Sequence, residues 1–134
     1  MIVVDTNLLV DYYIRRGRTE VAETVLDRDP HWMAPLLWRS EFRNVLVDLI
    51  ADGIVEFAEA VRVAQDAEYL LGGHEYQVMS AMVLRLAIDS GCSAYDCEFV
   101  ALAQDLGARL VTSDVEILRA FAGLAVAPER FARQ

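Results

Sequence analysis

The chain has 134 residues, of which 55% are hydrophobic and 25% are charged, and its formal net charge is −9 at pH 7. This composition, with a mean hydropathy of +0.27, excludes a disordered chain and indicates a single globular domain over residues 1–134. An acidic chain repels nucleic acid at long range, so a basic stripe cannot be the argument for RNA or DNA binding. All 12 basic residues are arginine, and lysine is absent.

The sequence also limits where the protein is expected to act. No apolar run approaches the ~20 residues that a membrane span requires, and the opening MIVVDTN lacks the basic region of a signal peptide. Cys92 and Cys97 are too few for a disulfide framework. We therefore expect a cytoplasmic protein with no membrane partner and with reduced, half-buried thiols.

Apolar periodicity and helix-end residues predict alternating strands and helices. Thr19, Ser80 and Ser93 are expected N-caps, and glycines such as Gly53 and Gly107 are expected to end helices. In chain order we expect a strand at 2–4, helices at 7–16 and 19–27, a strand at 31–35, helices at 36–51 and 56–71, a weak strand at 75–79, helices at 80–89 and 93–106, a strand at 109–112, a helix at 114–122 and a strand at 124–127.

This alternation predicts an α/β fold in which a mainly parallel sheet of about five strands carries helices on both faces. Such a sheet places its functional site at the carboxyl ends of the strands. Asp5 follows the first strand, and Asp114 follows the apolar run RLV after two hydroxyl residues. We expect the two carboxylates to meet at that edge.

Two further acids compete for the same place, and each has a plainer interpretation. Glu41 lies at the edge of the apolar stripe of its helix, so it is either a solvated flank residue or a site residue. Ser93 and Asp96 have the spacing of a capping box, so Asp96 could cap a helix. The capping and site interpretations of Asp96 are compatible, because a carboxylate in the first helical turn also points toward the carboxyl edge of the sheet.

Other acids and other chemistries are less informative. Ser113 and Glu116 form a second possible capping box, which is the better explanation of Glu116. The chain has no HExxH, no cysteine pair at zinc spacing, no EF-hand loop, no phosphate-binding glycine motif and no GxSxG. His31 and His74 are isolated, which indicates surface or internally satisfied histidines rather than metal ligands.

Four converging carboxylates would repel one another, by about 4 kcal/mol for two unit charges 4 Å apart at an effective dielectric of about 20. A protein tolerates this repulsion when a divalent cation offsets it or when some pKa values rise. Mg²⁺ and Mn²⁺ prefer oxygen ligands. Such a site polarises a phosphoryl oxygen and activates a water, so the natural reaction is in-line hydrolysis of a phosphodiester.

Four segments of the chain resemble the PIN-domain nucleases, specifically the VapC-type ribonuclease toxins of prokaryotic toxin–antitoxin pairs. They are VVDTN, LWRSEFRNVL, GCSAYDCEFVALAQDLGARLVTSD and VAPERF, in the family's order. The resemblance implies that four acids bind the metal and are catalytic, and that three further residues orient carboxylates or waters. The acids are Asp5, Glu41, Asp96 and Asp114; the orienting residues are Thr6, Asn7 and Ser113; Glu116 takes the place of an additional acid found in some members, and its role stays open.

The resemblance implies a Mg²⁺-dependent endoribonuclease, with Mn²⁺ as an alternative ion, that favours single strands. It implies products with a 5′-phosphate and a 3′-hydroxyl, RNA as substrate, a VapB-like cognate antitoxin and a homodimer, for which helices 36–51 and 56–71 have spare surface. A catalytically silent PIN module that binds a partner or RNA is the alternative. A phosphoacceptor signalling domain is a remote one, because such domains use a lysine that this chain lacks.

Overall fold

The computed structural model describes residues 1–134 and is built on a sheet of five parallel strands in the order β3-β2-β1-β4-β5. This confirms the predicted α/β fold with a parallel sheet. The chain moves from β1 outward to β2 and β3, then returns across the sheet to β4 and β5. The strands are β1 (Ile2–Val4), β2 (Trp32–Pro35), β3 (Glu75–Tyr76), β4 (Arg109–Val111) and β5 (Ala125–Val126).

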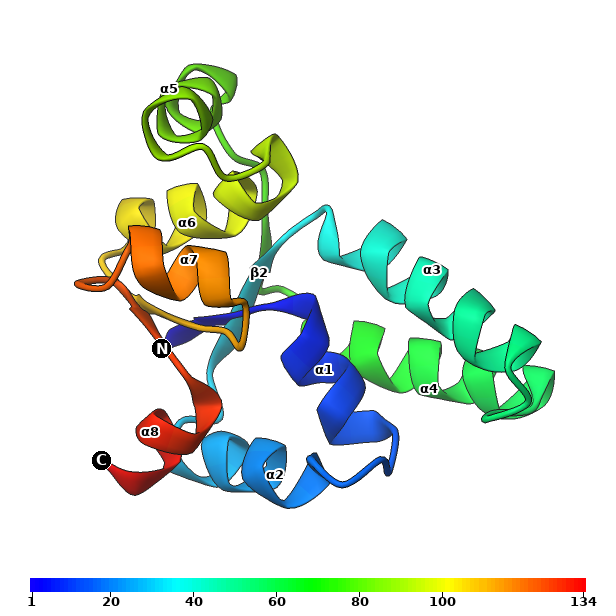
Figure 1. The fold of residues 1–134 in the computed structure, drawn as a ribbon. Coiled ribbons are helices and arrows are strands. Elements are labelled where there is room, and N and C mark those ends of the chain that lie inside the picture. Colours follow the sequence, from blue (N-terminus) through cyan, green and yellow to red (C-terminus); the bar gives the residue numbers. More distant parts are fainter.

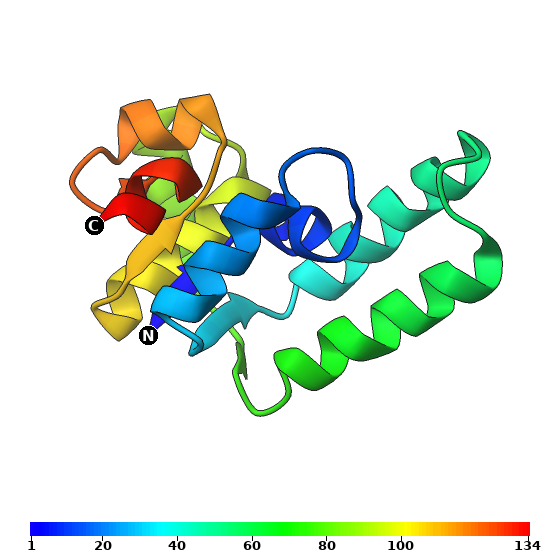
Figure 2. The same ribbon diagram turned by 90° about the horizontal axis from the view of Figure 1, so that it is seen from below.

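Eight helices surround this sheet, and α6 packs directly on β1, β2 and β4. Figure 1 shows α5, α6 and α7 on one side of the sheet and α2 and α8 on the other. The α3–α4 hairpin projects from the body in both Figure 1 and Figure 2. The helices are α1 (Thr6–Tyr13), α2 (Thr19–Arg28), α3 (Trp38–Ala51), α4 (Phe57–Leu70), α5 (Ser80–Ser90), α6 (Ala94–Leu106), α7 (Val115–Ala120) and α8 (Pro128–Arg133).

The main core cluster buries β1 over its whole length, and α6 is buried from Phe99 to Ala103, with Ala101 belonging to a second, small cluster. A strand covered on both faces has to be apolar throughout, which is why IVV shows no alternation. Five consecutive buried residues leave α6 no freedom to rotate about its axis. The core therefore fixes the direction in which the polar residues of its first turn point.

Several predicted helix ends are wrong. Ser93 is the N-cap of α6, as predicted, but Met79 rather than Ser80 precedes α5 and provides no side-chain cap. Thr19 is the first residue of α2 instead of its cap, because its hydroxyl is buried and donates to the carbonyl oxygens of Asp11 and Ile14. The hydroxyl of Thr19 therefore stabilises the loop between α1 and α2.

Three other expectations need adjustment. The strand expected at 75–79 is confined to Glu75–Tyr76, and the C-terminal helix α8 was not predicted, although Pro128 at its first position is a typical helix start. Cys92 and Cys97 are free thiols but are fully rather than half buried. None of the helices has both the length and the apolar character needed to cross a bilayer.

Candidate active site

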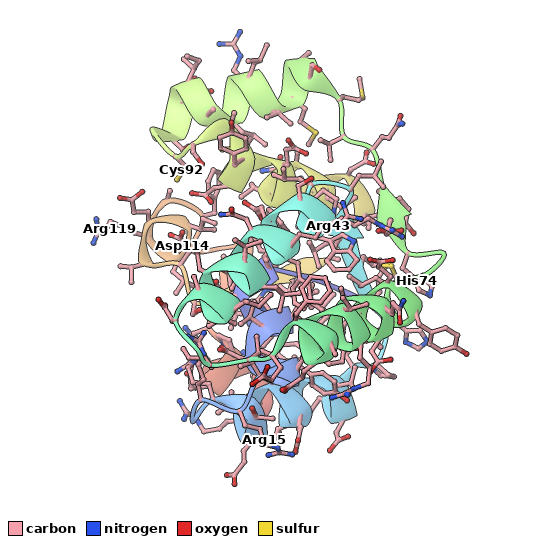
Figure 3. All side chains as sticks on the ribbon, turned by 90° about the vertical axis from the view of Figure 1, so that its right-hand side faces the viewer. Arg15, Arg43, His74, Cys92, Asp114 and Arg119 are labelled. Carbon is pink, nitrogen blue, oxygen red and sulfur yellow. The ribbon has the colours of Figure 1, made fainter.

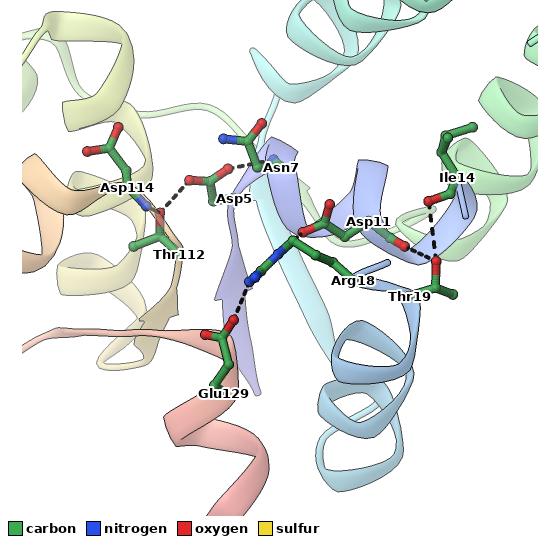
Figure 4. A network of polar contacts seen from close by, with 9 residues as sticks. All are labelled: Asp5, Asn7, Asp11, Ile14, Arg18, Thr19, Thr112, Asp114 and Glu129. Carbon is green, nitrogen blue, oxygen red and sulfur yellow. Dashed lines mark hydrogen bonds and ion pairs between the residues drawn. The ribbon is translucent and has the colours of Figure 1, made fainter. Parts of the chain in front are cut away.

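The carboxyl ends of β1 and β4 lie side by side because the two strands pair in parallel, with Val4 opposite Val111. Asp5 and Thr112 each follow the paired residue, so they become neighbours across the sheet edge. The hydroxyl of Thr112 donates to Oδ2 of Asp5 and accepts the backbone N–H of Asp114 at 3.0 Å (Figure 4). One buried hydroxyl thus links the two predicted acids.

This edge is also the point where the strand order reverses, since β1 is followed by β2 on one side and is paired with β4 on the other. Open parallel sheets form their ligand crevice at such a switch point. Here a hollow of about 210 Å³ opens, and all four predicted acids line it. Its lining consists of Asp5, Thr6, Asn7, Glu41, Asn44, Val45, Asp96, Phe99, Asp114 and Ile117, with no arginine or histidine.

Three helices begin at this hollow, and two of them are capped by the acids themselves. Asp5 caps α1 by accepting the backbone N–H of Asn7 at 2.6 Å. Asp114 caps α7 by accepting the backbone N–H groups of Glu116 and Ile117 at 2.9 and 3.1 Å. Ser93 caps α6. Helix N-termini carry partial positive charge, which offsets part of the repulsion among the carboxylates.

The cap of α7 corrects one prediction. Asp114 has the extended backbone of an N-cap, so the helix starts one residue later than a Ser113–Glu116 capping box requires. The side chain of Ser113 is exposed and does not line the hollow. Glu116 is also exposed and lines a separate depression with Cys92 and Arg119.

Glu41 is held toward the hollow by α1. The hydroxyl of Thr6 donates to Oε1 of Glu41 at 2.7 Å, which connects the first turn of α1 to α3. Glu41 is half-buried and lines the hollow, which favours the site interpretation over that of a solvated flank residue. Asp96 is also half-buried. Its backbone N–H donates to the hydroxyl oxygen of Ser93, and a hydrogen bond from the Ser93 side chain lowers the pKa of its carboxyl.

Asp5 is the most buried of the acids, with 9% of its surface exposed. Burial raises the pKa of Asp5, because the charged form loses its hydration. The hydrogen bonds from Thr112 and Asn7 oppose this shift, and the negative charges of Asp114 and Asp96 add to it. The net pKa of Asp5 lies above its ordinary value.

The pKa values of Glu41 and Asp96 are also raised, and burial is again the largest cause. The hydrogen bond from Thr6 lowers the pKa of Glu41, whereas the charges of Asp5 and Asp96 raise it. The charge of Asp114 raises the pKa of Asp96. Burial first, and repulsion between the carboxylates second, thus disfavours ionisation of these three neighbouring acids.

The donor set of the hollow fits a hard divalent cation, because it offers carboxylate oxygens and contains no basic side chain. In the side-chain orientations of the structure, no group of three acids, histidines or cysteines is arranged as a metal-binding cluster. Oxygens of Asp5, Glu41 and Asp114 instead accept hydrogen bonds from the protein. Binding an ion would therefore require these carboxylates to turn.

The basic residues near the site are engaged elsewhere or face solvent. Arg18 pairs with Asp11 and Glu129 (Figure 4), and the side chain of Arg39 pairs with Glu75. Figure 3 shows Arg15 and Arg119 at the periphery of the molecule, with their side chains directed outward. The charge of the hollow is thus not balanced from within the chain.

Two lining or supporting residues were missed from the sequence. Asn44 lies one turn after Glu41 on α3, so helical spacing could have identified it. Thr112 and Ser113 are adjacent hydroxyl residues before Asp114. Which of the two contacts Asp5 depends on how β4 is aligned with β1. That register is a property of the folded sheet.

Comparison with known proteins agrees with this geometry. Residues 2–123 match the PIN domain family. Ribonuclease VapC3 of Pyrobaculum aerophilum is 27% identical over 136 aligned residues, which cover 92% of this chain and 96% of that protein.

Solved structures of similar fold include PAE2754 from the same archaeon, with a TM-score of 0.74, 23% identity, and coverage of 99% of this chain and 90% of that one. A toxin–antitoxin complex from Klebsiella pneumoniae has a TM-score of 0.67 and 20% identity, with coverage of 96% of this chain and 98% of that one. At these identities the structural similarities show the fold alone.

Proposed function

Because the chain belongs to the PIN domain family, we propose that it is a Mg²⁺- or Mn²⁺-dependent endoribonuclease and the toxin of a type II toxin–antitoxin pair. The observation that carries the proposal is the hollow at the strand switch point, which gathers four carboxylates with no basic side chain. The similarity to Ribonuclease VapC3 over nearly the whole chain supports RNA as the substrate. Retention of all four acids favours an enzyme over a silent binding module.

In this proposal Asp5, Asp96, Glu41 and Asp114 hold the ion through their carboxylate oxygens. The bound ion would polarise a phosphoryl oxygen and lower the pKa of a water. Thr6 keeps Glu41 turned toward the hollow through its hydroxyl. The chain offers no activated serine, cysteine or histidine nucleophile at the hollow, so water attack with 5′-phosphate and 3′-hydroxyl products is the proposed outcome.

Asn7, Ser113 and Glu116 have weaker structural support as orienting residues. Asn7 lines the hollow and donates its backbone N–H to Asp5. Ser113 does not reach the hollow, and Thr112 makes the contact that was expected of it. Glu116 acts on Asp96 through its charge, which raises the pKa of that carboxyl. We keep Asn7 in the proposed site and assign to Thr112 the role expected of Ser113.

We also propose a VapB-like antitoxin, a homodimer and action in the cytoplasm, where RNA is available. The fold similarity to a toxin–antitoxin complex supports the antitoxin. Exposed Val47, Phe57 and Val61 on α3 and α4 offer apolar surface for a second copy. Light scattering of Phe57→Asp tests the homodimer: a monomer is expected, and an unchanged dimer would place the contact elsewhere, for example at Ile88 of α5.

Cleavage of an end-labelled single-stranded RNA tests the enzymatic proposal. We expect cleavage with Mg²⁺ or Mn²⁺, none in EDTA, and fragments whose 5′-phosphates permit ligation. Asp96→Asn should abolish cleavage, whereas Asp105→Asn, which removes the same charge about two and a half turns further along α6, should retain it. Full activity in excess EDTA would exclude the proposed chemistry.

A further inference from the structure

A second and larger hollow lies beside the acid hollow, on the other side of the first turns of α6. Its volume is about 440 Å³, in the range of small-molecule sites. It is bounded by the turn before α3, the segment after β3, and α5. Glu98 is its one charged residue and Gln77 and Ser80 are its other polar ones; the apolar walls are Leu36, Tyr76, Val78, Val83 and Leu84.

Glu98 has no bonding partner within the chain. Its side chain is half-buried, and no hydrogen bond or ion pair engages its carboxylate. An acceptor in an apolar wall costs free energy unless a donor satisfies it, so this carboxylate calls for a ligand that brings N–H groups.

The two hollows are close neighbours. Asp96 lines the acid hollow and Glu98, two residues later on α6, lines the larger one. A ligand spanning both hollows would place one part against the four acids and another against Glu98.

We propose that the larger hollow is a nucleobase subsite, which holds a guanine next to the phosphodiester that the acid hollow would cleave. This inference rests on the proposed ribonuclease function and assigns its base preference. Single-stranded RNA is recognised by bases that unstack into apolar or aromatic pockets and expose their Watson–Crick edge. Tyr76 and the aliphatic walls supply such a pocket.

Guanine is the base that fits the carboxylate best. An ionised carboxylate can only accept hydrogen bonds, and guanine presents its N1–H and N2 amino group side by side. Cytosine and adenine each present one amino group beside a bare ring nitrogen acceptor, and uracil presents one N–H flanked by two carbonyl oxygens that repel the carboxylate. The expected order is therefore guanine first and uracil last.

A binding cycle tests the contact without requiring cleavage. Fluorescence anisotropy with Mg²⁺ would compare a short RNA containing one guanosine with the same RNA carrying inosine, which lacks the N2 amino group. Asp96→Asn and the double variant Asp96→Asn/Glu98→Gln would be measured in parallel. We expect inosine to weaken binding about tenfold in the first protein, the scale of one base-edge contact, and to have little effect in the second.

The control is Asp105→Asn on the same background, since Asp105 lies two turns from Glu98 along α6 and does not line the hollow. This control protein should bind the inosine RNA about tenfold more weakly than the guanosine RNA, as Asp96→Asn does. An equal inosine effect with and without Glu98 would overturn the proposal, as would absence of RNA binding. A shift of oligomeric state in Glu98→Gln, measured by light scattering, would also overturn it and assign the hollow to a protein partner.

Failure of this inference differs from failure of the proposed function. If the parent cleaves RNA but Glu98→Gln leaves the distribution of cleaved sites unchanged, the ribonuclease proposal is supported and the guanine subsite is refuted. If the parent never cleaves RNA but the inosine effect on binding depends on Glu98, the guanine subsite is supported and the enzymatic proposal is refuted.

Discussion

Replacing Asp96 by asparagine should stabilise the metal-free protein. The carboxyl group of Asp96 has one hydrogen-bonding neighbour, the hydroxyl of Ser93, and the oxygen of an amide of the same shape can accept from that hydroxyl as well. The backbone N–H that Ser93 accepts is retained. What the substitution removes is a half-buried negative charge whose pKa is raised by burial and by the charges of Asp114 and Glu116.

The expected gain is modest because Asp96 is partly exposed and solvent screens its interactions. Pairs of exposed charges contribute about 0.2–1 kcal/mol each. Relief from two like charges, together with the lost burial cost, gives about 0.5–1.5 kcal/mol. For a chain of this length, that free energy raises Tm by about 2–6 °C.

The pH dependence follows from the direction of the shift. A raised pKa means that the folded state binds more protons than the unfolded state between the ordinary and the raised value, so stability falls as pH rises through that window. Asp96→Asn removes this loss. The gain in Tm should therefore be small near pH 4 and reach its full size at neutral pH.

Thermal melts of the parent and Asp96→Asn in EDTA, from pH 4 to pH 8, measure this directly. Mg²⁺ should narrow or reverse the difference, because an ion bound only by the folded parent stabilises it by mass action. Asp105→Asn controls for net charge. A parent that is more stable than Asp96→Asn in EDTA at neutral pH, with neither melt responding to Mg²⁺, would refute the idea of one strained acidic site.

Three other outcomes are expected. Thr112→Val should lower the free energy of unfolding by about 1–3 kcal/mol, since the buried carboxylate of Asp5 loses its hydrogen-bond donor, and Thr112→Ser should lower it less. Urea melts measure both, and equal losses of stability would contradict the role of the hydroxyl. Asp5→Ala should abolish RNA cleavage and growth arrest, and Cys97→Ala should retain both, as cleavage assays and growth curves would show; an inactive but folded Cys97→Ala would contradict this. Ca²⁺ should replace Mg²⁺ poorly in the cleavage assay because its looser coordination misplaces the water, and equal rates would argue against a water held by the ion.

The order of elements could be predicted from the sequence because apolar runs and periodicity are local properties. The meeting of Asp5 and Asp114 could also be predicted, since carboxyl ends of neighbouring parallel strands share one edge. The sequence could not predict which hydroxyl links Asp5 to Asp114. Thr112 and Ser113 are adjacent, and only the alignment of β4 with β1 decides which of them contacts Asp5. A shift of one residue reverses which side chain points inward.

The helix caps show the same limit. Ser93 was identified because α6 begins where its apolar pattern begins. Asp114 was assigned to the acid site alone, although it also starts α7. The buried hydroxyl of Thr19 is committed to carbonyl oxygens of the preceding loop, a tertiary contact that outweighs its capping preference. Local patterns locate a helix well but do not reveal which nearby group competes for its end.

The double duty of Asp5 and Asp114 as acids and as helix caps has an evolutionary consequence. Asparagine is as good an N-cap as aspartate, and one base change converts an aspartate codon to an asparagine codon. Either position can thus lose its charge while α1 or α7 keeps its cap. A lineage carrying this fold can therefore reach a neutral pocket through single base changes that keep both helix caps.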